Sequence, residues 1–189
     1  MSILITGLLL FIGLHLIPSA GVHIKSGLIE RYGKKHYVIA FGSIAATSVV
    51  TIIIGWQNTN PGFLYTPPIW GYHVTPALTL AAFILIISNN MPTNIKRFIR
   101  HPRYMGILLW AVGHLFANGE LRSVLLFGSF SLWTIISMLS ASNHEDKRAK
   151  PKSQPLIKDL ITVLLALILY IGFLLVHKWL IGVSPLPFI

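Results

Sequence analysis

The sequence predicts an all-α fold, a polytopic membrane protein whose six transmembrane helices form one domain over residues 1–189. Hydrophobic residues make up 54% of the chain and charged residues only 11%, against about 25% charged in an ordinary soluble domain. The mean hydropathy is +0.72. These values exclude soluble globular, disordered and fibrous proteins. The chain has no cysteine, which excludes disulfides, zinc–thiolate sites and iron–sulfur clusters.

Six apolar stretches come close to the roughly 20 residues that a helix needs to cross the hydrocarbon core. The first is interpreted as a span, not a cleaved signal peptide, because the basic residue Lys25 follows the apolar run instead of preceding it. The third opens with Trp70 and Tyr72, which are typical of the membrane interface. The fourth is short and follows Pro102. The predicted spans are residues 3–22, 38–56, 69–88, 104–118, 123–141 and about 160–179.

Positive charge predicts the orientation of these spans. Every lysine and arginine except Arg122 and Lys178 lies between spans one and two, three and four, or five and six. Because basic loops stay in the cytoplasm, these three loops are expected inside and both termini outside. The formal net charge of +10 then marks loops that face the lipid bilayer and its anionic headgroups. No nucleic-acid partner is expected.

Two histidines are predicted to lie well inside spans, where a polar side chain is costly and needs a reason. His15 precedes Lys25 by 10 residues and His114 follows Arg103 by 11, or about 15 and 16 Å of helix. Both are therefore expected at a similar depth, on different helices. Two facing imidazoles suit a metal that already has equatorial ligands, which is a haem with axial histidines. The alternative is that each histidine only hydrogen-bonds a neighbouring helix.

The fourth span carries further candidate cofactor-binding residues. Gly106, Trp110, His114 and Asn118 are spaced by four and share a helix face. This stripe is expected either to line a cofactor slot or to serve ordinary helix packing.

Arg100, His101 and Arg103 surround the start of the same span, where free N–H groups and the helix dipole attract anions. The anion is a haem propionate, the carboxylate of a methyl donor or a lipid headgroup, unless the arginines only anchor the span. Glu120 and Arg122, in the turn before the fifth span, are interpreted as turn and cap residues.

The run RHPRYMGILLWAVGHLFANGE, from Arg100 to Glu120, and the segment GLHLIPS, from Gly13 to Ser19, resemble the NnrU family of bacterial membrane proteins. The resemblance covers roughly residues 3–150 and leaves a further C-terminal helix. It implies a bacterial inner-membrane protein associated with nitrite and nitric oxide metabolism, or denitrification. A lipophilic or gaseous small ligand is expected with it.

The NnrU family is similar to plant 15-cis-zeta-carotene isomerase, a membrane enzyme with a b-type haem. The two haem-associated histidines of that isomerase match His15 and His114. Its cysteine is Ala111 here, so a switch between cysteine and histidine ligation does not carry over. The resemblance implies haem b between the first and fourth spans, with Arg100, His101 and Arg103 around its propionates. Its role is redox, isomerase-like or gas-binding.

Two other classes remain open. The piece from Arg100 to Gly106 also resembles isoprenylcysteine and phospholipid methyltransferases, which bind S-adenosylmethionine and carry an acidic pair that Glu145 and Asp146 would supply here. The usual Gly-Pro-Tyr before the Arg-His-Pro is absent. The last class is an accessory protein without a cofactor. Whether the chain is an enzyme is left open.

Overall fold

The computed structural model describes residues 1–144 and 151–185, and in these ranges the protein is all-α apart from one isolated bridge between Phe63 and Glu120. The predicted fold class is confirmed. The helices are α1 (Ser2–Ser19), α2 (Val22–Tyr32), α3 (Lys34–Gln57), α4 (Ile69–Ser88), α5 (Ile95–Phe98), α6 (Pro102–Ala117), α7 (Leu121–His144) and α8 (Leu156–Ile181).

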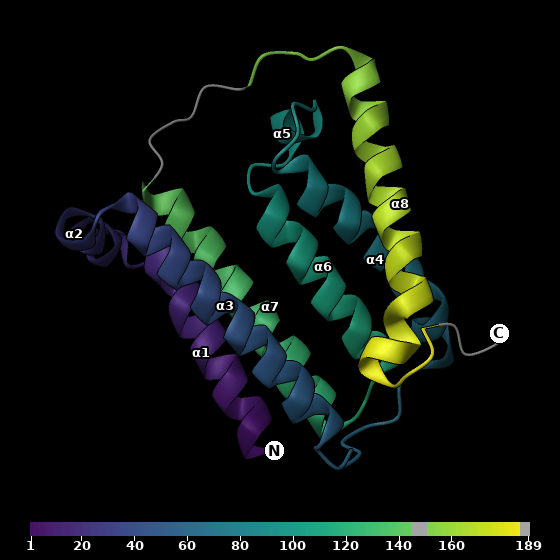
Figure 1. Ribbon diagram of the computed structural model, residues 1–189. Coiled ribbons are helices and arrows are strands. Elements are labelled where there is room, and N and C mark those ends of the chain that lie inside the picture. Colours follow the sequence, from purple (N-terminus) through teal and green to yellow (C-terminus); the bar gives the residue numbers. More distant parts are fainter. Residues whose placement is uncertain (145–150, 186–189) are drawn as a thin grey trace.

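The long helices form two groups (Figure 1). One group contains α1, α3 and α7, and the other contains α4, α6 and α8; α6 packs against α7 and joins the two. In the first group Leu4 and Leu8 of α1 pack on Ile52 of α3, and a second apolar cluster joins Trp56 of α3, Ala111 of α6 and Phe127 of α7. Since lipid tails are as apolar as these side chains, close packing and internal hydrogen bonds hold the helices together.

Five of the described helices are long and apolar enough to cross a membrane: α1, α3, α4, α7 and α8. The fourth predicted span is α6, which has 16 residues and is about 24 Å long, somewhat less than the hydrocarbon core. It nevertheless runs antiparallel to α4, with Gly106 beside Ala82 at one end and Phe116 beside Gly71 at the other.

The predicted boundaries differ most at the first span. The helix ends at Ser19, and α2 begins at Val22 after a break at Ala20 and Gly21. Residues 23–37, which were predicted to form a loop, instead contain most of α2. This helix has no buried residue and carries Lys25 and Arg31. Such a helix lies at the surface of the bundle, beside the ends of α1 and α3.

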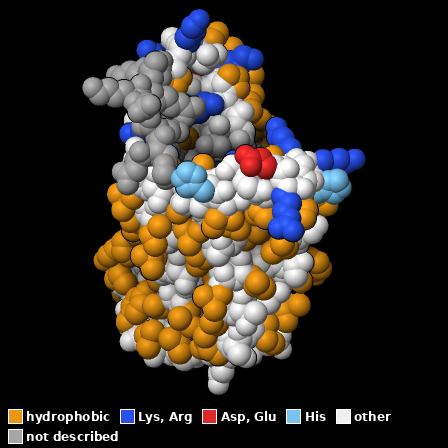
Figure 2. Space-filling model, turned by 90° about the vertical axis from the view of Figure 1, so that its left-hand side faces the viewer, with side chains coloured by type: hydrophobic (Ala, Val, Ile, Leu, Met, Phe, Trp, Pro, Cys, Tyr) orange, Lys and Arg blue, Asp and Glu red, His pale blue; other side chains and the backbone are white. Residues whose placement is uncertain are grey.

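The bundle has two chemically different ends. The basic end carries α2, α5 and the start of α8, and Figure 2 shows lysine and arginine side chains gathered there above a band of apolar side chains. At this end the Asp159 carboxylate of α8 accepts hydrogen bonds from the hydroxyl of Thr93 and from the backbone and side-chain amides of Asn94. These bonds tie the chain between α4 and α5 to α8. The opposite end is called the far end below.

Close backbone contacts determine how α4 and α6 meet. Gly71 of α4 lies against the carbonyl group of Phe116, so that a Cβ atom would overlap the Phe116 oxygen. Gly106 of α6 is similarly close to the Ala82 carbonyl oxygen of α4, at 2.8 Å from where its Cβ would lie. Small residues at such positions allow the helix backbones to approach.

Replacing Gly71 by alanine is therefore expected to destabilise the protein by about 1–3 kcal/mol, because the new methyl group forces α4 and α6 apart. Gly172→Ala in α8 is the matched control: nothing lies within 4 Å of its Cβ position, and helix propensity favours alanine by roughly 0.5–1 kcal/mol. Unfolding of both variants in the same detergent measures the difference. Equal stability of the two variants would contradict this packing.

Candidate functional site

An apolar cavity of about 370 Å³ lies towards the far end, between α3, α4, α6, α7 and α8. We call it the far-end cavity. Its walls are rich in aromatic side chains contributed by all five helices: Trp56, Tyr72, Trp110, Phe127, Tyr170 and Phe173. The volume falls in the range of about 300–1,000 Å³ that is usual for small-molecule and cofactor sites.

His114 lines this cavity together with Trp110 and Asn118. Its Nδ1 atom donates to the carbonyl oxygen of Trp110 at 2.8 Å, one helical turn back. Because a carbonyl only accepts, the neutral ring carries its proton on Nδ1 and leaves the lone pair on Nε2. The ring also stacks on Phe127, with centroids 4.6 Å apart. Metal-ligating histidines are often fixed through their second nitrogen in this way, and His15 and His36 make the same bond one turn back along their helices.

Two further polar groups in the cavity wall have no internal partner. Within the described residues, Nε1 of Trp56 and Oγ1 of Thr79 are buried and form no hydrogen bond. These side chains are only 6% and 9% exposed. A buried donor without an acceptor is costly, so its partner is expected to come from outside the chain. Both residues belong to the cavity wall.

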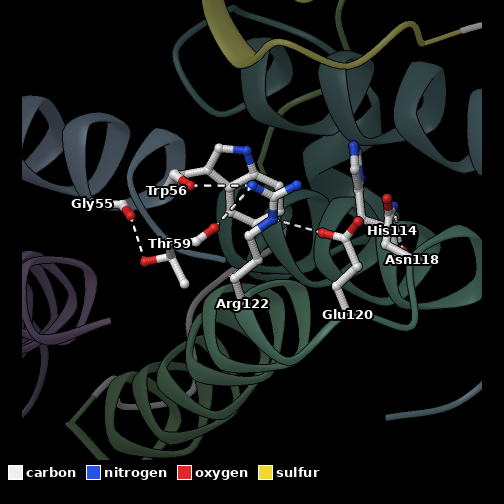
Figure 3. A network of polar contacts seen from close by, with 7 residues as sticks. All are labelled: Gly55, Trp56, Thr59, His114, Asn118, Glu120 and Arg122. Carbon is white, nitrogen blue, oxygen red and sulfur yellow. Dashed lines mark hydrogen bonds and ion pairs between the residues drawn. The ribbon is translucent and has the colours of Figure 1, made fainter. Parts of the chain in front are cut away.

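An ion pair between Arg122 and Glu120 lies beside the site (Figure 3). Nε of Arg122 donates to the Glu120 carboxylate at 2.6 Å, and Nη1 donates to the carbonyl oxygens of Trp56 and Thr59. The guanidinium also lies over the Trp56 ring, 4.5 Å from its centroid. The sequence analysis interpreted both residues as turn and cap residues. Glu120 does cap α7, since its carbonyl oxygen accepts from the amide of Val124. It also lines the cavity, and Arg122 connects α7 to α3.

The loop between α3 and α4 is fixed against the turn between α6 and α7. The Leu64 amide donates to the Gly119 carbonyl oxygen at 2.8 Å, and the Tyr65 hydroxyl donates to the carbonyl oxygens of Leu115 and Asn118. Burial raises the pKa of Tyr65, so its phenol remains a donor at neutral pH. The end of α6 that carries His114 is thus held by the loop.

His15 lies outside the far-end cavity. Its Nδ1 donates to the Phe11 carbonyl oxygen at 2.8 Å, which also leaves Nε2 with the lone pair. The ring packs on Phe11, Phe41 and Trp133. Phe11 contacts the ring of Phe130, which contacts the ring of Trp110. Trp110 in turn contacts His114. Aromatic side chains thus occupy the space between the two imidazoles.

The two histidines are not at the same depth. His15 is four residues from the end of α1 nearer the basic end, whereas His114 is three residues from the far end of α6. Their ring contacts on α7, Trp133 and Phe127, are about 9 Å apart along the helix. The sequence estimate differed because it counted helical rise from Lys25 across the break between α1 and α2.

The other sequence candidates separate into two places. Trp110 and Asn118 line the cavity with His114. Arg100, His101 and Arg103 lie at the basic end, where Nε2 of His101 and the hydroxyl of Ser142 are 3.0 Å apart and Arg103 lies over the Tyr104 ring. Arg103 is about 16 Å along α6 from His114.

Two further predictions concern Gly106 and the acidic pair Glu145 and Asp146. Gly106 does not line the cavity: it packs on α4, as the packing alternative had it. The acidic pair Glu145 and Asp146, which the methyltransferase alternative needs, lies outside the described residues.

These observations define a polytopic helical membrane protein with an apolar cavity at one end of its bundle. The chain belongs to the NnrU family: the family model described as NnrU protein matches residues 3–185. The match confirms the resemblance and extends it through α8. Comparisons with curated proteins and with solved structures gave no significant match.

Removing the Arg122 guanidinium is expected to destabilise the far end strongly. The side chains of Arg122 and Glu120 are only 13% and 22% exposed, and breaking such a pair from one side costs about 3 kcal/mol. Arg122→Ala should therefore lower the free energy of unfolding more in the wild type than the same substitution does in the Glu120→Ala variant. A double-mutant cycle of unfolding free energies measures this coupling. Strictly additive effects would show that the ion pair contributes nothing.

Proposed function

We propose that this NnrU-family protein binds haem b, with Nε2 of His114 as an axial ligand. The observation that carries the proposal is the orientation of His114: its Nδ1 is held by the Trp110 carbonyl and its ring lines a cavity with aromatic walls. Neutral imidazole is a good ligand for iron, and cofactor sites in helical bundles are built in this way from inward-facing side chains.

The far-end cavity suits a flat, apolar ring that carries carboxylates. Trp110 and Phe127 flank His114 as aromatic walls. When bound, the haem would supply one-electron chemistry or a site for a gaseous ligand. Arg100, His101 and Arg103, which the sequence offers for the propionates, lie at the basic end and do not line this cavity. They suit only the alternative haem placed between α1 and α6.

We place the protein in the bacterial inner membrane, with both termini in the periplasm, in keeping with the basic residues gathered at the opposite end of the bundle. Its proposed role is redox, isomerase-like or gas-binding, and linked to nitrite and nitric oxide metabolism through the family resemblance. A readily displaced axial ligand would favour gas binding or catalysis on a lipophilic substrate. Two tightly bound axial histidines would favour electron transfer.

The sequence offers His15 for the second axial position, in a haem placed between α1 and α6. Its free Nε2 supports that assignment. A haem held in this way would have to replace the contacts that Phe130 makes with Phe11 and Trp110. Comparing His15 and His114 variants therefore tests the site residue by residue.

His114→Ala is expected to remove most of the bound haem, lowering the Soret absorbance per protein by about tenfold or more, since even outer-shell changes cost a metal site 10–100-fold. His36→Ala is the matched control: His36 also donates Nδ1 to a carbonyl one turn back, that of Tyr32, but it is exposed and outside the cavity. Absorption spectra of the purified variants make the comparison. Wild-type protein without a Soret band would remove the haem proposal. Equal bands in all three proteins would show that haem binds without His114 and would remove this residue as its ligand.

A further inference from the structure

A second histidine lines the same cavity as His114. It is His177 of α8. His114 is three residues from the far end of α6, and His177 is four residues from the far end of α8. At 1.5 Å of rise per residue, the distances of the two residues from the ends of their helices differ by less than about 2 Å.

The C-terminal turn of α8 holds His177 in the same tautomer as His114. Gly182 ends the helix with φ 82°, a left-handed conformation that turns the chain back on the helix. The carbonyl oxygen of Val183 then accepts a hydrogen bond from Nδ1 of His177 at 2.8 Å. A carbonyl six residues ahead reaches the ring only because of this turn, unlike the one-turn-back bond common to helical histidines. Nε2 is left with the lone pair.

The two rings line the cavity from different helices. His114 stands on α6 against Trp110 and Phe127, while His177 stands on α8 against Phe173. No hydrogen bond between the two rings is found among the described residues. Two free Nε2 atoms therefore border one apolar space.

His15 lacks these relations to His114. It is not part of the cavity wall, it lies towards the basic end, and it is surrounded by Phe11, Phe41 and Trp133.

We propose that His177 is the second axial ligand, bound through Nε2 on the side of the haem opposite His114. This inference rests on the proposed function and replaces His15 in that position. A flat ring between α6 and α8 would then lie in the far-end cavity, next to the Trp56 and Thr79 donors. Paired histidine ligation of this kind leaves no open coordination position on the iron.

The test compares His177→Ala with His15→Ala in purified full-length protein loaded with haem b. Electron paramagnetic resonance of the oxidised protein reports whether the iron is low-spin, with two strong ligands, or high-spin. Carbon monoxide added to the reduced protein reports an open position. We expect His177→Ala to become high-spin and to bind carbon monoxide, while His15→Ala keeps the low-spin signal of the wild type.

A third variant separates loss of a ligand from loss of the fold. His177→Met offers a thioether in place of the imidazole, and histidine–methionine ligation raises the potential of a haem. We expect it to restore a low-spin signal with an upward shift of the midpoint potential. His23→Ala, on the exposed surface of α2, controls for the removal of any histidine.

The outcomes are distinct. High-spin His15→Ala beside low-spin His177→Ala would overturn the inference and return the second position to His15. Haem bound with an unchanged spectrum in both variants would exclude both residues while leaving the haem proposal intact. Failure of the wild type to bind haem at all would overturn the proposed function and this inference together.

Discussion

The hydrogen bond from Nδ1 of His114 to the carbonyl oxygen of Trp110 is the interaction on which the proposed site depends. It selects the tautomer that leaves Nε2 free, and it fixes the ring against Phe127 at the edge of an apolar cavity. The helix beneath it is held equally closely, because α6 touches α4 through backbone contacts at Gly71 and Gly106. The far-end loop adds hydrogen bonds to the last carbonyl groups of α6. A ligand arriving at His114 would therefore meet a nitrogen that is already oriented, which lowers the cost of binding.

The membrane explains how polar residues are distributed in the rest of the bundle. Serine and threonine side chains within the helices return their hydrogen bonds to carbonyl groups one turn back, as Thr134 and Thr162 do. The Arg122–Glu120 pair and the Asp159 network lie at opposite ends, where each also ties two helices together. Among the described residues some buried polar atoms lack a hydrogen bond, at Trp56 and Thr79 in the cavity wall but also at Ser123, Ser131 and Trp133 of α7. The reason to assign the cavity a ligand is therefore its aromatic wall together with its two histidines.

Much of the fold follows from the sequence because hydrophobic length and positive charge report directly on the membrane. The apolar stretches and the basic loops predicted the long helices and the end at which α2 and α5 lie. The break at Ala20 and Gly21 was missed, since nothing in the apolar run marks it, and with it the offset between His15 and His114. The site was predicted in part: Trp110, His114 and Asn118 share one face of α6, as their spacing indicated. His177 was overlooked because spacing within a helix does not reveal which helix packs beside it.

The central claim is that the far-end cavity is a haem site built around His114. Its most direct test is the haem content of the wild-type protein, purified from its native membrane and measured as the pyridine haemochrome against protein concentration. The account predicts b-type haem at close to one equivalent per chain. A purified, folded protein that contains no haem and does not take it up when haem is supplied would contradict the account.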